Sequence, residues 1–581
     1  MRRTGGAGAG AGAQTVVEAF LDSADRAPDR LAFHVIERSE AEAGEEHALS
    51  HADVRGLLAR SVGGLAEHGI GAGERVLLIL PTSRDFLAAY LGCLYAGAAP
   101  LVLAEPLDGR TAQYAEHVRR TAELAGARHL ITTPERAAAL APLVPLRVLT
   151  PGHLRGAPAE LDKPYARPDT LAQLQATSGS TGTPRLAAVR HGNLTANVGA
   201  IAEAIRARPD DVLVSWLPLF HDMGLVGISY ALWSGIPMVL SDPVNFLRNP
   251  LAWPGWIHRF RGTLSPAPSS AFHICARVAG RRPPRDLDLS CWRVALCGAE
   301  PVREGTMREF QEAFGPFGLP ETTLRPVYGL AEATLAVTIS DVTRPYAADH
   351  VDAESVAARG RAVVPRVSDG GPRGTSVMCV GRVLPGHGLR VTDAEGSPLP
   401  ERWIGEVEVS GPSVIEGYLG GASAEPGAAG PELKRPDGWL RTGDLGYLAD
   451  DELYVTGRSK DLVIIAGRNC VPEQIESFVE AAAGGPRRAA VVAVGVPDPA
   501  LGTEQLHLLL DERMAEGRDR REITGAVSEA LAEVFGLGGV TYHWVRRSEL
   551  PRTTSGKIQR HLCRRLIEER YAAAVPTEKS P

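Results

Sequence analysis

The chain has 581 residues, of which 44% are hydrophobic and 23% charged, a composition typical of a globular protein with a sizeable core. Its 62 Lys and Arg residues against 69 Asp and Glu residues give a net charge of -7, which argues against nucleic acid or an anionic membrane as main partner. No apolar run approaches the roughly 18 residues that a membrane span needs. Seven scattered cysteines follow no zinc-site spacing, so we expect free thiols in a reducing cytoplasm.

The first half of the chain alternates short apolar runs with amphipathic stretches, as α/β domains do. Residues 1–13, which carry two arginines and a Gly/Ala tract without an apolar segment, predict a disordered tail rather than a secretory signal. Residues 75–81 predict a buried strand, and residues 85–97 predict a helix that Gly97 ends. Residues 420–438, rich in Gly, Ala and Pro, predict an exposed loop.

The pattern changes after about Gly457 to that of a compact α+β unit. Residues 462–465 and 489–496 predict short strands. Pro472 predicts the start of a helix, and residues 522–535 predict a second helix with its apolar residues on one face.

A run of hydroxyls and glycines that ends on a cation lies near the end of the first third of the chain. Its members are Thr177, Ser178, Gly179, Ser180, Thr181, Gly182, Thr183, Pro184 and Arg185. Glycines let backbone N–H groups face inward and hydroxyls add donors, so the run can form a cradle for phosphate oxygens. It lacks the spacing of a Walker A loop, and a Gly/Ser tract alone is more often a flexible surface loop.

Six further segments follow this run and decide its interpretation. They are residues 216–225 (WLPLFHDMGL), 298–301 (GAEP), 328–334 (YGLAEAT), 439–446 (WLRTGDLG), 457–461 (GRSKD) and 550–558 (LPRTTSGKI). The order, spacing and residues of these segments resemble the motifs of the adenylate-forming superfamily, which comprises acyl-CoA synthetases, peptide-synthetase adenylation domains and luciferases. The fatty acyl-AMP ligase branch is the most similar, and the resemblance runs from about Gln14 to the C-terminus.

The resemblance implies an α/β fold with a large multi-subdomain N-terminal adenylation domain over residues 14–457, which contains the acyl pocket. It also implies a small, mobile α+β domain over residues 458–581, with Lys460 at the hinge. Two half-reactions follow: a carboxylate attacks the α-phosphate of ATP and releases pyrophosphate, and a thiol then attacks the acyl-adenylate. The first step requires neutralised phosphate charge and in-line positioning rather than an acid–base pair.

Roles at the nucleotide follow from motif position. The implied set consists of Thr177, Ser178, Gly179, Ser180, Thr181, Gly182, Thr183, Gly298, Ala299, Glu300, Tyr328, Gly329, Asp444 and Arg458. The loop from residue 177 to residue 183 would grip the β- and γ-phosphates. Tyr328 would stack on adenine, and Asp444 and Arg458 would hold the ribose. Read without the resemblance, Tyr328 is as well explained as a core residue.

The resemblance implies three catalytic residues. Glu332, together with Thr181, would hold Mg²⁺, a hard cation that takes carboxylate and phosphate oxygens. Lys557 would bridge the substrate carboxylate and the α-phosphate as a mobile point charge. His221 would form a wall between ATP and the acyl pocket. A lone acid is usually a solvated surface residue and a lone histidine usually a structural one, so these roles depend on the joint match.

The acyl pocket is where the sequence departs most from the branch. The implied pocket residues are His221, Asp222, Met223, Ser269 and Ser270. Ser269 and Ser270 stand where fatty acyl-AMP ligases typically have Asn and Phe. Loss of an aromatic side chain opens volume, so a cyclic or branched natural-product acid competes with a straight fatty acid as substrate, and repacking of the wall is an equally open alternative. Arg185 replaces the usual Lys and keeps its charge, and Cys297 replaces Asn as a buried small side chain.

The acceptor of the acyl group is predicted from a long polar segment at residues 340–376. Acyl-CoA synthetases are shorter there, and in the ligase branch the extra residues pack on the C-terminal domain and disfavour CoA. We therefore expect an acyl carrier protein, with an acyl-CoA ligase as the alternative. An amino-acid adenylation enzyme is a third hypothesis, because Asp222 lies near the usual amino-group acid. A scaffold that has lost catalysis is a fourth, and the presence of Glu332, Asp444 and Lys557 argues against it.

Overall fold

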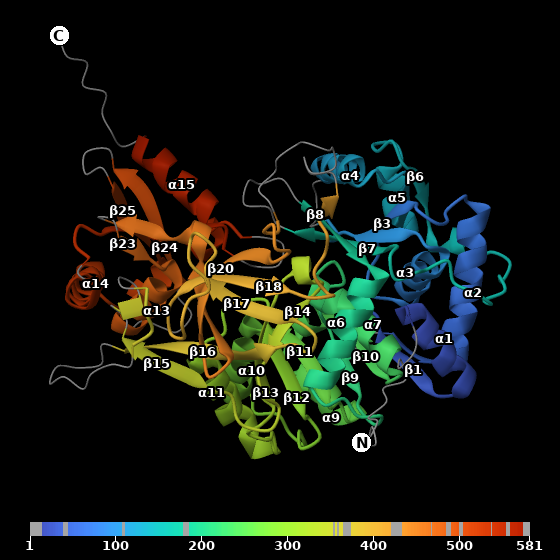
Figure 1. Cartoon of the computed structure of the whole chain (residues 1–581), viewed down its shortest axis with the longest axis horizontal. Coiled ribbons are helices and arrows are strands. Elements are labelled where there is room, and N and C mark those ends of the chain that lie inside the picture. Colours follow the sequence, from blue (N-terminus) through green and yellow to red (C-terminus); the bar gives the residue numbers. More distant parts are fainter. Residues whose placement is uncertain are drawn as a thin grey trace, which may run out of the picture. The chain divides into compact units, whose positions relative to one another are not determined.

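The computed structural model divides the chain into two compact units (Figure 1). It describes residues 14–38, 45–106, 111–177, 185–352, 355–356, 360–363, 374–419, 433–465, 468–483, 490–498, 503–535, 537–552 and 558–572. Unit 1 comprises Met1–Tyr346, Val380–Gly388 and Val409–Leu440, and unit 2 comprises Ala347–Cys379, Leu389–Glu408 and Arg441–Pro581. Compact units do not locate a hinge, so the boundary at Gly457 stays a prediction. The predicted tail, residues 1–13, lies outside the described residues.

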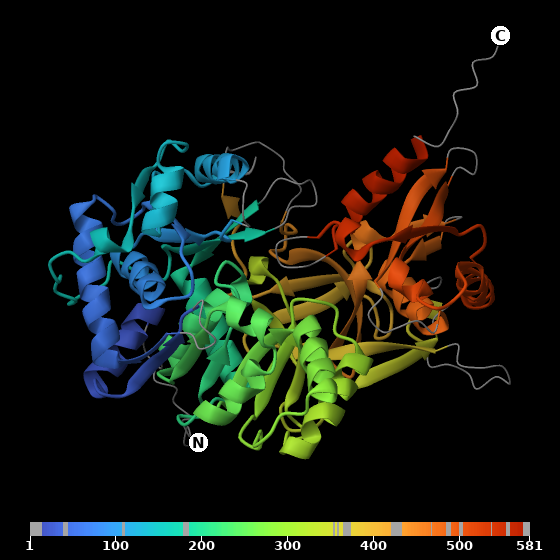
Figure 2. The ribbon, with the colours of Figure 1, turned by 180° about the vertical axis from the view of Figure 1, so that it is seen from behind.

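The first sheet of unit 1 has the strand order β14-β13-β12-β11-β9-β10-β1-β2 and is parallel except at its two outer strands. Its strands are β1 (Leu31–Ile36), β2 (Glu46–Ser50), β9 (Leu213–Ser215), β10 (Met238–Ser241), β11 (Leu264–Pro268), β12 (Val294–Gly298), β13 (Leu324–Gly329) and β14 (Ala336–Ile339). The helices of this region are α1 (Val16–Arg26), α2 (His51–Glu67), α6 (His191–Ala204), α7 (Asp222–Ser234), α8 (Pro243–Arg248), α9 (Ala252–Phe260), α10 (Ser269–Arg281) and α11 (Glu304–Phe314). Helix α10 packs on α11, and these yellow-green helices lie over one face of the sheet in Figure 2.

The second sheet of unit 1 has the order β19-β8-β7-β4-β3-β5-β6. Its strands are β3 (Arg75–Ile79), β4 (Ala99–Val102), β5 (His129–Thr132), β6 (Arg147–Leu149), β7 (Leu171–Thr177), β8 (Arg185–Arg190) and β19 (Tyr418–Leu419), and its helices are α3 (Arg84–Ala96), α4 (Thr111–Ala125) and α5 (Pro134–Leu140). Strands β3 to β7 pair in parallel, whereas β7, β8 and β19 pair antiparallel.

Helix α3 follows β3 of the second sheet, contacts helix α7 of the first-sheet region, and is buried from Phe86 to its end. The Tyr90 hydroxyl donates to Gln173 of β7 at 2.7 Å and lies 3.3 Å from the Ser229 hydroxyl of α7. The predicted strand and helix over residues 75–97 are thereby confirmed as β3 and α3. Gly97 ends α3 with φ of 73°, a left-handed conformation that glycine adopts without strain.

Unit 2 contains a sheet of order β17-β18-β20-β21-β16, with β15 paired to β16. Its strands are β15 (Ala348–Asp352), β16 (Gly374–Val383), β17 (Gly388–Thr392), β18 (Gly405–Ser410), β20 (Leu440–Ala449) and β21 (Glu452–Arg458). Strand β15 belongs to the long segment at residues 340–376. Its Asp349 carboxylate accepts from Tyr447 at 2.8 Å and from Arg402 at 2.9 Å. Strand β15 therefore packs on the β20–β21 hairpin.

The last part of unit 2 confirms the α+β pattern predicted for the C-terminal residues. It consists of β22 (Val463–Ile465), β23 (Arg468–Cys470), α13 (Pro472–Ala482), β24 (Val491–Asp498), β25 (Thr503–Asp511), α14 (Arg520–Phe535), β26 (Thr541–Val545) and α15 (Arg560–Ala572). Helix α13 begins at the predicted Pro472, and its Ile475 and Val479 are buried in the core of this part. Within the described residues, no helix is long and apolar enough to cross a membrane. All seven cysteines are free.

Candidate active site

The hydroxyl- and glycine-rich loop connects two antiparallel neighbours. Strand β7 ends at Thr177 and β8 begins at Arg185, and these two residues are direct register partners. The Thr177 hydroxyl donates to the Arg185 carbonyl at 3.4 Å. The predicted phosphate-binding residues Ser178, Gly179, Ser180, Thr181, Gly182 and Thr183 lie outside the described residues. The structure thus fixes both ends of the loop, and its phosphate role stays a prediction.

A cation, a phenol and a carboxylate follow one another beside this loop. The Arg185 guanidinium lies 5.3 Å from the centre of the Tyr418 ring. The Tyr418 hydroxyl donates to Glu332 Oε1 at 2.5 Å. Burial, together with the Glu332 charge, raises the pKa of Tyr418, so the phenol stays protonated and remains a donor. Sequence analysis missed Tyr418, because nothing in its own surroundings marks it as a partner of Glu332.

The turn that carries Glu332 is held from two sides. Glu332 lies in a 3₁₀ turn, Ala331–Ala333, after β13, and its carbonyl accepts from the Ile415 N–H at 2.9 Å. Thr334 has φ of 71°, a strained conformation for a β-branched residue, and its hydroxyl donates to the Ser413 carbonyl at 2.6 Å. These contacts fix the position from which the Glu332 carboxylate extends.

Two motif glycines are required by close packing. A Cβ added at Gly329 would lie 1.9 Å from the Leu335 carbonyl oxygen, and one added at Gly298 would lie 2.7 Å from a methyl group of Val327. Both clashes are with atoms of the protein itself. Packing alone therefore accounts for glycine at these two positions, and close approach of a nucleotide is not needed to explain it. Tyr328 is half-buried in β13, next to Gly329. Its proposed stacking on adenine is not tested by these contacts.

Predicted nucleotide and pocket residues meet at the start of α10. The Glu300 carboxylate accepts from the Ser270 N–H at 2.8 Å and from its hydroxyl at 3.2 Å, so it caps the helix. Ser270 is exposed, whereas Ser269 is buried beside Cys297. Ala299, between Gly298 and Glu300, has φ of 64°, a left-handed conformation. Cys297 is fully buried and burial raises its pKa, which confirms a packing role.

His221 and Asp222 form a pair at the start of α7. His221 Nδ1 lies 2.6 Å from Asp222 Oδ1, and the Met223 N–H donates to the same carboxylate at 2.7 Å. The Met223 N–H also donates to His221 Nδ1 at 3.2 Å, so the imidazole caps α7 through this nitrogen. The Gln175 amide donates to the Phe220 carbonyl at 2.9 Å, which ties this segment to β7. Met223 is buried.

Asp444 and Arg458, the two predicted ribose residues, are brought together in unit 2. They are register partners in the β20–β21 hairpin, and Arg458 Nε lies 2.8 Å from Asp444 Oδ1. Gly443 precedes Asp444 with φ of 70°, and its carbonyl accepts from the Ser459 hydroxyl at 3.1 Å. Lys460 follows as an exposed residue of the 3₁₀ turn Ser459–Asp461.

The chain around Lys557 is anchored by an arginine that sequence analysis missed. Lys557 itself lies outside the described residues. Three residues later, Arg560 forms ion pairs with Glu473 at 2.7 Å and with Glu476. Burial lowers the pKa of Arg560, but the two carboxylates outweigh it and hold the pKa well above its ordinary value. The sequence offered one indication of this contact: Glu473 and Glu476 lie three residues apart, so they share one helix face that can bind a cation.

The described residues fit Mg²⁺ bound mainly through a substrate. No cluster of three His, Cys, Asp or Glu side chains suited to a metal ion occurs in the described part of the chain. Glu332 offers one carboxylate whose neighbour is a neutral hydroxyl donor. Mg²⁺ in phosphate-transfer sites takes one or two carboxylates, phosphate oxygens and water, so a single acid suffices.

Comparisons with known proteins show which family the chain resembles over its length. A sequence profile of AMP-binding enzymes matches residues 20–419. A Caulobacter vibrioides protein with the provisional name acyl-CoA synthetase is 34% identical over 499 residues, 85% of each chain. The medium-chain-fatty-acid–[acyl-carrier-protein] ligase JamA of Moorena producens is 32% identical over 531 residues, 87% of this chain and 88% of its own. A structure from a study of fatty acyl-adenylate ligases of E. coli and L. pneumophila is 31% identical, with a TM-score of 0.84 over 97% of this chain and 99% of that one.

Fold, motifs and relatives together define an adenylate-forming ligase. The predicted fold class and the predicted enzyme class are both confirmed. The chain belongs to the family of AMP-binding enzymes, and it is similar over nearly its whole length to fatty acyl-AMP ligases.

Proposed function

We propose that the enzyme activates a fatty acid or a bulky natural-product acid as acyl-AMP and then transfers the acyl group to the phosphopantetheine thiol of an acyl carrier protein. The observation that carries this proposal is the contact chain from Arg185 through Tyr418 to Glu332, which links a carboxylate to the cation that directly follows residues 178–184 in the sequence. The similarity of the whole chain to fatty acyl-adenylate ligases supports the acid as substrate.

In the first half-reaction a carboxylate oxygen attacks the α-phosphorus of ATP, forming one P–O bond while the bond to the pyrophosphate oxygen breaks. Negative charge develops on the phosphate oxygens in the transition state. Hydrogen-bond donors and cations that already lie in position before the reaction therefore contribute most to lowering the barrier. The loop at residues 177–183 and Arg185 supply them in this proposal. Mg²⁺, held by Glu332 with Thr181, would neutralise phosphate charge. Asp444 and Arg458 would orient the ribose, and Tyr328 the adenine.

The acyl side of the site would be bounded by His221, Met223 and Ser269. In amino-acid adenylation, the acid near position 222 must bind an ammonium group. Here the Asp222 carboxylate lies within 2.6 Å of His221 Nδ1 and accepts the Met223 N–H, and these contacts already occupy one of its oxygens. The second Asp222 oxygen could still accept an ammonium group, so the proposal of a plain carboxylic acid over an amino acid depends on the similarity to fatty acyl-adenylate ligases.

The acceptor is proposed to be a carrier protein because of the segment at residues 340–376. Its strand β15 pairs with β16, and its Asp349 binds Tyr447 of the hairpin that carries Asp444 and Arg458. These contacts hold β15 of the segment within unit 2. The proposal is that the segment also stabilises one domain orientation, and a tenfold population shift would need only about 1.4 kcal/mol. A relative named as a carrier-protein ligase supports this choice, while the relative provisionally named acyl-CoA synthetase keeps CoA as the alternative.

ATP–pyrophosphate exchange across a panel of acids tests the activation step. Linear fatty acids, bulky cyclic acids and amino acids separate the substrate hypotheses, and no exchange with any acid would contradict the proposal. Purified acyl-adenylate supplied with either CoA or a phosphopantetheinylated carrier, with the thioester measured by mass, tests the acceptor. Efficient acylation of CoA by the unmodified enzyme would establish the alternative.

Lys557→Ala tests the assignment of the adenylation cation. We expect exchange to fall by about 10²–10³, as for other lost electrostatic contacts to a developing charge. Thioester formation from preformed acyl-adenylate should be spared, because Lys557 would face the substrate in only one of the two half-reactions. Exchange at the wild-type rate would refute the role.

A further inference from the structure

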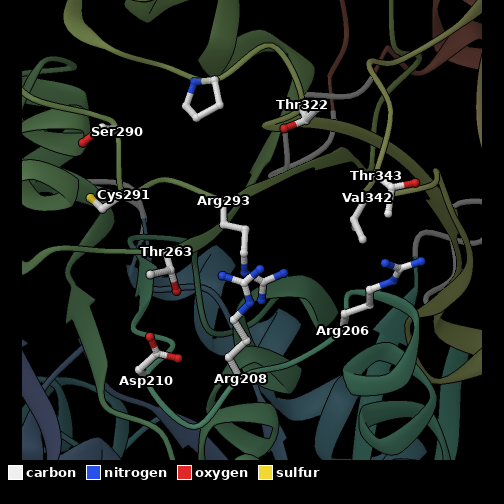
Figure 3. Close-up of a pocket in the computed structure, with 11 residues that line it drawn as sticks. Arg206, Arg208, Asp210, Thr263, Ser290, Cys291, Arg293, Thr322, Val342 and Thr343 are labelled. Carbon is white, nitrogen blue, oxygen red and sulfur yellow. The ribbon is translucent and has the colours of Figure 1, made fainter.

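Unit 1 contains a cavity of about 470 Å³ (Figure 3). Thr263, Arg293 and Thr322, which line it, come just before β11, β12 and β13. The cavity therefore lies at the amino ends of the parallel strands. Ser269, Gly298 and Glu332 lie at or just beyond the carboxyl ends of the same strands, roughly 16 Å away by the rise of five strand residues. The two sites occupy opposite edges of one sheet.

The floor of this cavity is a fixed network around one buried carboxylate. Asp211 accepts from Arg293 Nη2 at 2.7 Å and from the Thr263 hydroxyl at 2.8 Å. It also accepts from the Arg208 N–H at 2.7 Å. Arg293 further donates to the Ile205 carbonyl at 2.6 Å. The charges of Asp211 and Arg293 cancel, and the network holds the surrounding backbone in one geometry.

Two more arginines add charge that this network does not cancel. Arg206 and Arg208 line the cavity as exposed residues, and Asp210 is the acidic residue among its lining. In Figure 3, Arg208 extends toward Arg293, and Arg206 reaches toward Val342 and Thr343. Within the described ranges, no hydrogen bond or ion pair engages the Arg208 guanidinium. Asp341 faces the charges of Arg206 and Arg344. With the Asp211–Arg293 pair cancelled, the three arginines Arg206, Arg208 and Arg344 against Asp210 and Asp341 leave one positive charge.

The backbone at Arg206 indicates that its side chain is needed there. Arg206 follows α6 with φ of 51°, a left-handed conformation that glycine adopts without cost. Gly97 and Gly235 hold the same position after α3 and α7. Arg261 is the comparable exception after α9, and its guanidinium forms an ion pair with Asp288 at 2.8 Å. The Arg206 guanidinium lines the cavity instead. The backbone strain at Arg206 therefore places a positive charge where it could bind a ligand.

We propose that this cavity binds a small organic phosphate. Guanidinium groups present paired N–H donors that match phosphate oxygens, and the Thr322 and Thr343 hydroxyls at the wall can add single hydrogen bonds. A phosphate group presents more oxygens and more negative charge to the Arg206 and Arg208 guanidinium groups than a carboxylate does. The cavity falls within the size range of small-molecule sites, so the phosphate would carry an organic group. This proposal does not depend on the reaction proposed above.

Isothermal titration of the full-length enzyme with ribose 5-phosphate and with inorganic phosphate, at fixed ionic strength, tests the site. We expect saturable binding of ribose 5-phosphate that is tighter than that of inorganic phosphate. The Arg206→Gln/Arg208→Gln variant should bind at least about tenfold more weakly. Arg281→Gln/Arg282→Gln, which removes the same charge from the exposed end of α10, should bind like the wild type.

Pyrophosphate exchange without added phosphate ligand should stay within about twofold of wild type in both variants, because neither touches the candidate active site. Equal loss of binding in the two variants would mean that the overall charge of the protein, and not this cavity, determines phosphate binding. That result would overturn the proposed site. Unchanged binding in the pocket variant, or no saturable binding to the wild type, would also overturn it. Binding of inorganic phosphate alone would overturn the assignment of an organic ligand.

Discussion

Glu332 of unit 1 and Asp444 of unit 2 are both carboxylates proposed to serve the nucleotide, yet their neighbours differ in charge. Glu332 accepts from the neutral Tyr418 hydroxyl at 2.5 Å. Asp444, whose side chain is 6% exposed, lies 2.8 Å from Arg458 Nε. A neutral donor leaves the negative charge on Glu332, whereas a guanidinium largely cancels the charge on Asp444.

This difference suits two kinds of ligand. A divalent cation needs net negative charge at its ligand, and Glu332 provides it. A ribose hydroxyl is neutral and needs a hydrogen-bond acceptor held in one orientation, and the ion pair with Arg458 fixes Asp444 in this way. The residue type alone does not distinguish these tasks. The partner of each carboxylate does.

Removing the charge of Glu332 should have the largest effect. We expect Glu332→Gln to lower the rate of pyrophosphate exchange by about 10²–10³, because the amide keeps the shape but cannot hold Mg²⁺ electrostatically. Exchange measured over a Mg²⁺ titration checks this. Glu332→Asp keeps the charge on a shorter side chain and should lose less. Equal losses in both variants would mean that the position of the carboxylate matters as much as its charge, and wild-type exchange by Glu332→Gln would contradict a role of the charge.

Asp444→Asn should have a smaller effect, concentrated in ATP binding. The loss of one charged acceptor for the ribose costs about 1.5–3 kcal/mol, or about 10- to 100-fold in the KM for ATP. Glu406→Gln is the matched control, since Glu406 pairs with Arg441 at 2.6 Å in the same unit. A similar rise in KM from the control would assign the effect to general loss of an ion pair in this sheet.

Tyr418→Phe tests whether the phenol orients Glu332. Loss of a side chain that orients a metal-binding group typically lowers metal affinity or activity tenfold or more. We therefore expect the rate of pyrophosphate exchange to fall about tenfold and its dependence on Mg²⁺ concentration to shift. Tyr447→Phe removes the same kind of bond, from a buried phenol to Asp349 at 2.8 Å. If Tyr447→Phe shifts the Mg²⁺ dependence as strongly, the contact between Tyr418 and Glu332 has no special role.

Local patterns in the sequence were enough to predict several elements of the fold. The apolar run and amphipathic stretch at residues 75–97 predicted β3 and α3, and Gly97 predicted the end of α3. Pro472 likewise marked the start of α13. Such signals act within one or two turns of chain, and tertiary packing reinforces them.

Partners distant in the sequence were not predictable. Tyr418 and Glu332 are 86 residues apart, and Arg560 and Glu476 are 84 apart. Only the register of β19 on β8 places Tyr418 beside Arg185. A single sequence contains no signal for such pairings, since they follow from how strands associate in the sheet.

The acyl pocket gives the last and smallest expected effect. We predict that Ser269→Asn with Ser270→Phe narrows the pocket, so that activity on the widest accepted acid falls about tenfold while short linear acids are spared. The reason is the added bulk at positions where this chain has only hydroxymethyl groups. Exchange rates over a size series of acids measure this change in selectivity. Equal losses on wide and narrow acids would contradict a role of these residues in shaping the pocket.

The two positions should contribute unequally. Ser269 is buried, so Ser269→Asn alone should account for most of the narrowing. Ser270 is exposed and donates through its N–H and its hydroxyl to Glu300. Ser270→Phe alone keeps the N–H donor and loses only the weaker bond, so it should change selectivity little. A strong change in selectivity from Ser270→Phe alone would show that an aromatic side chain at this position enters the pocket. In that case position 270, and not Ser269, would limit the width of the substrate.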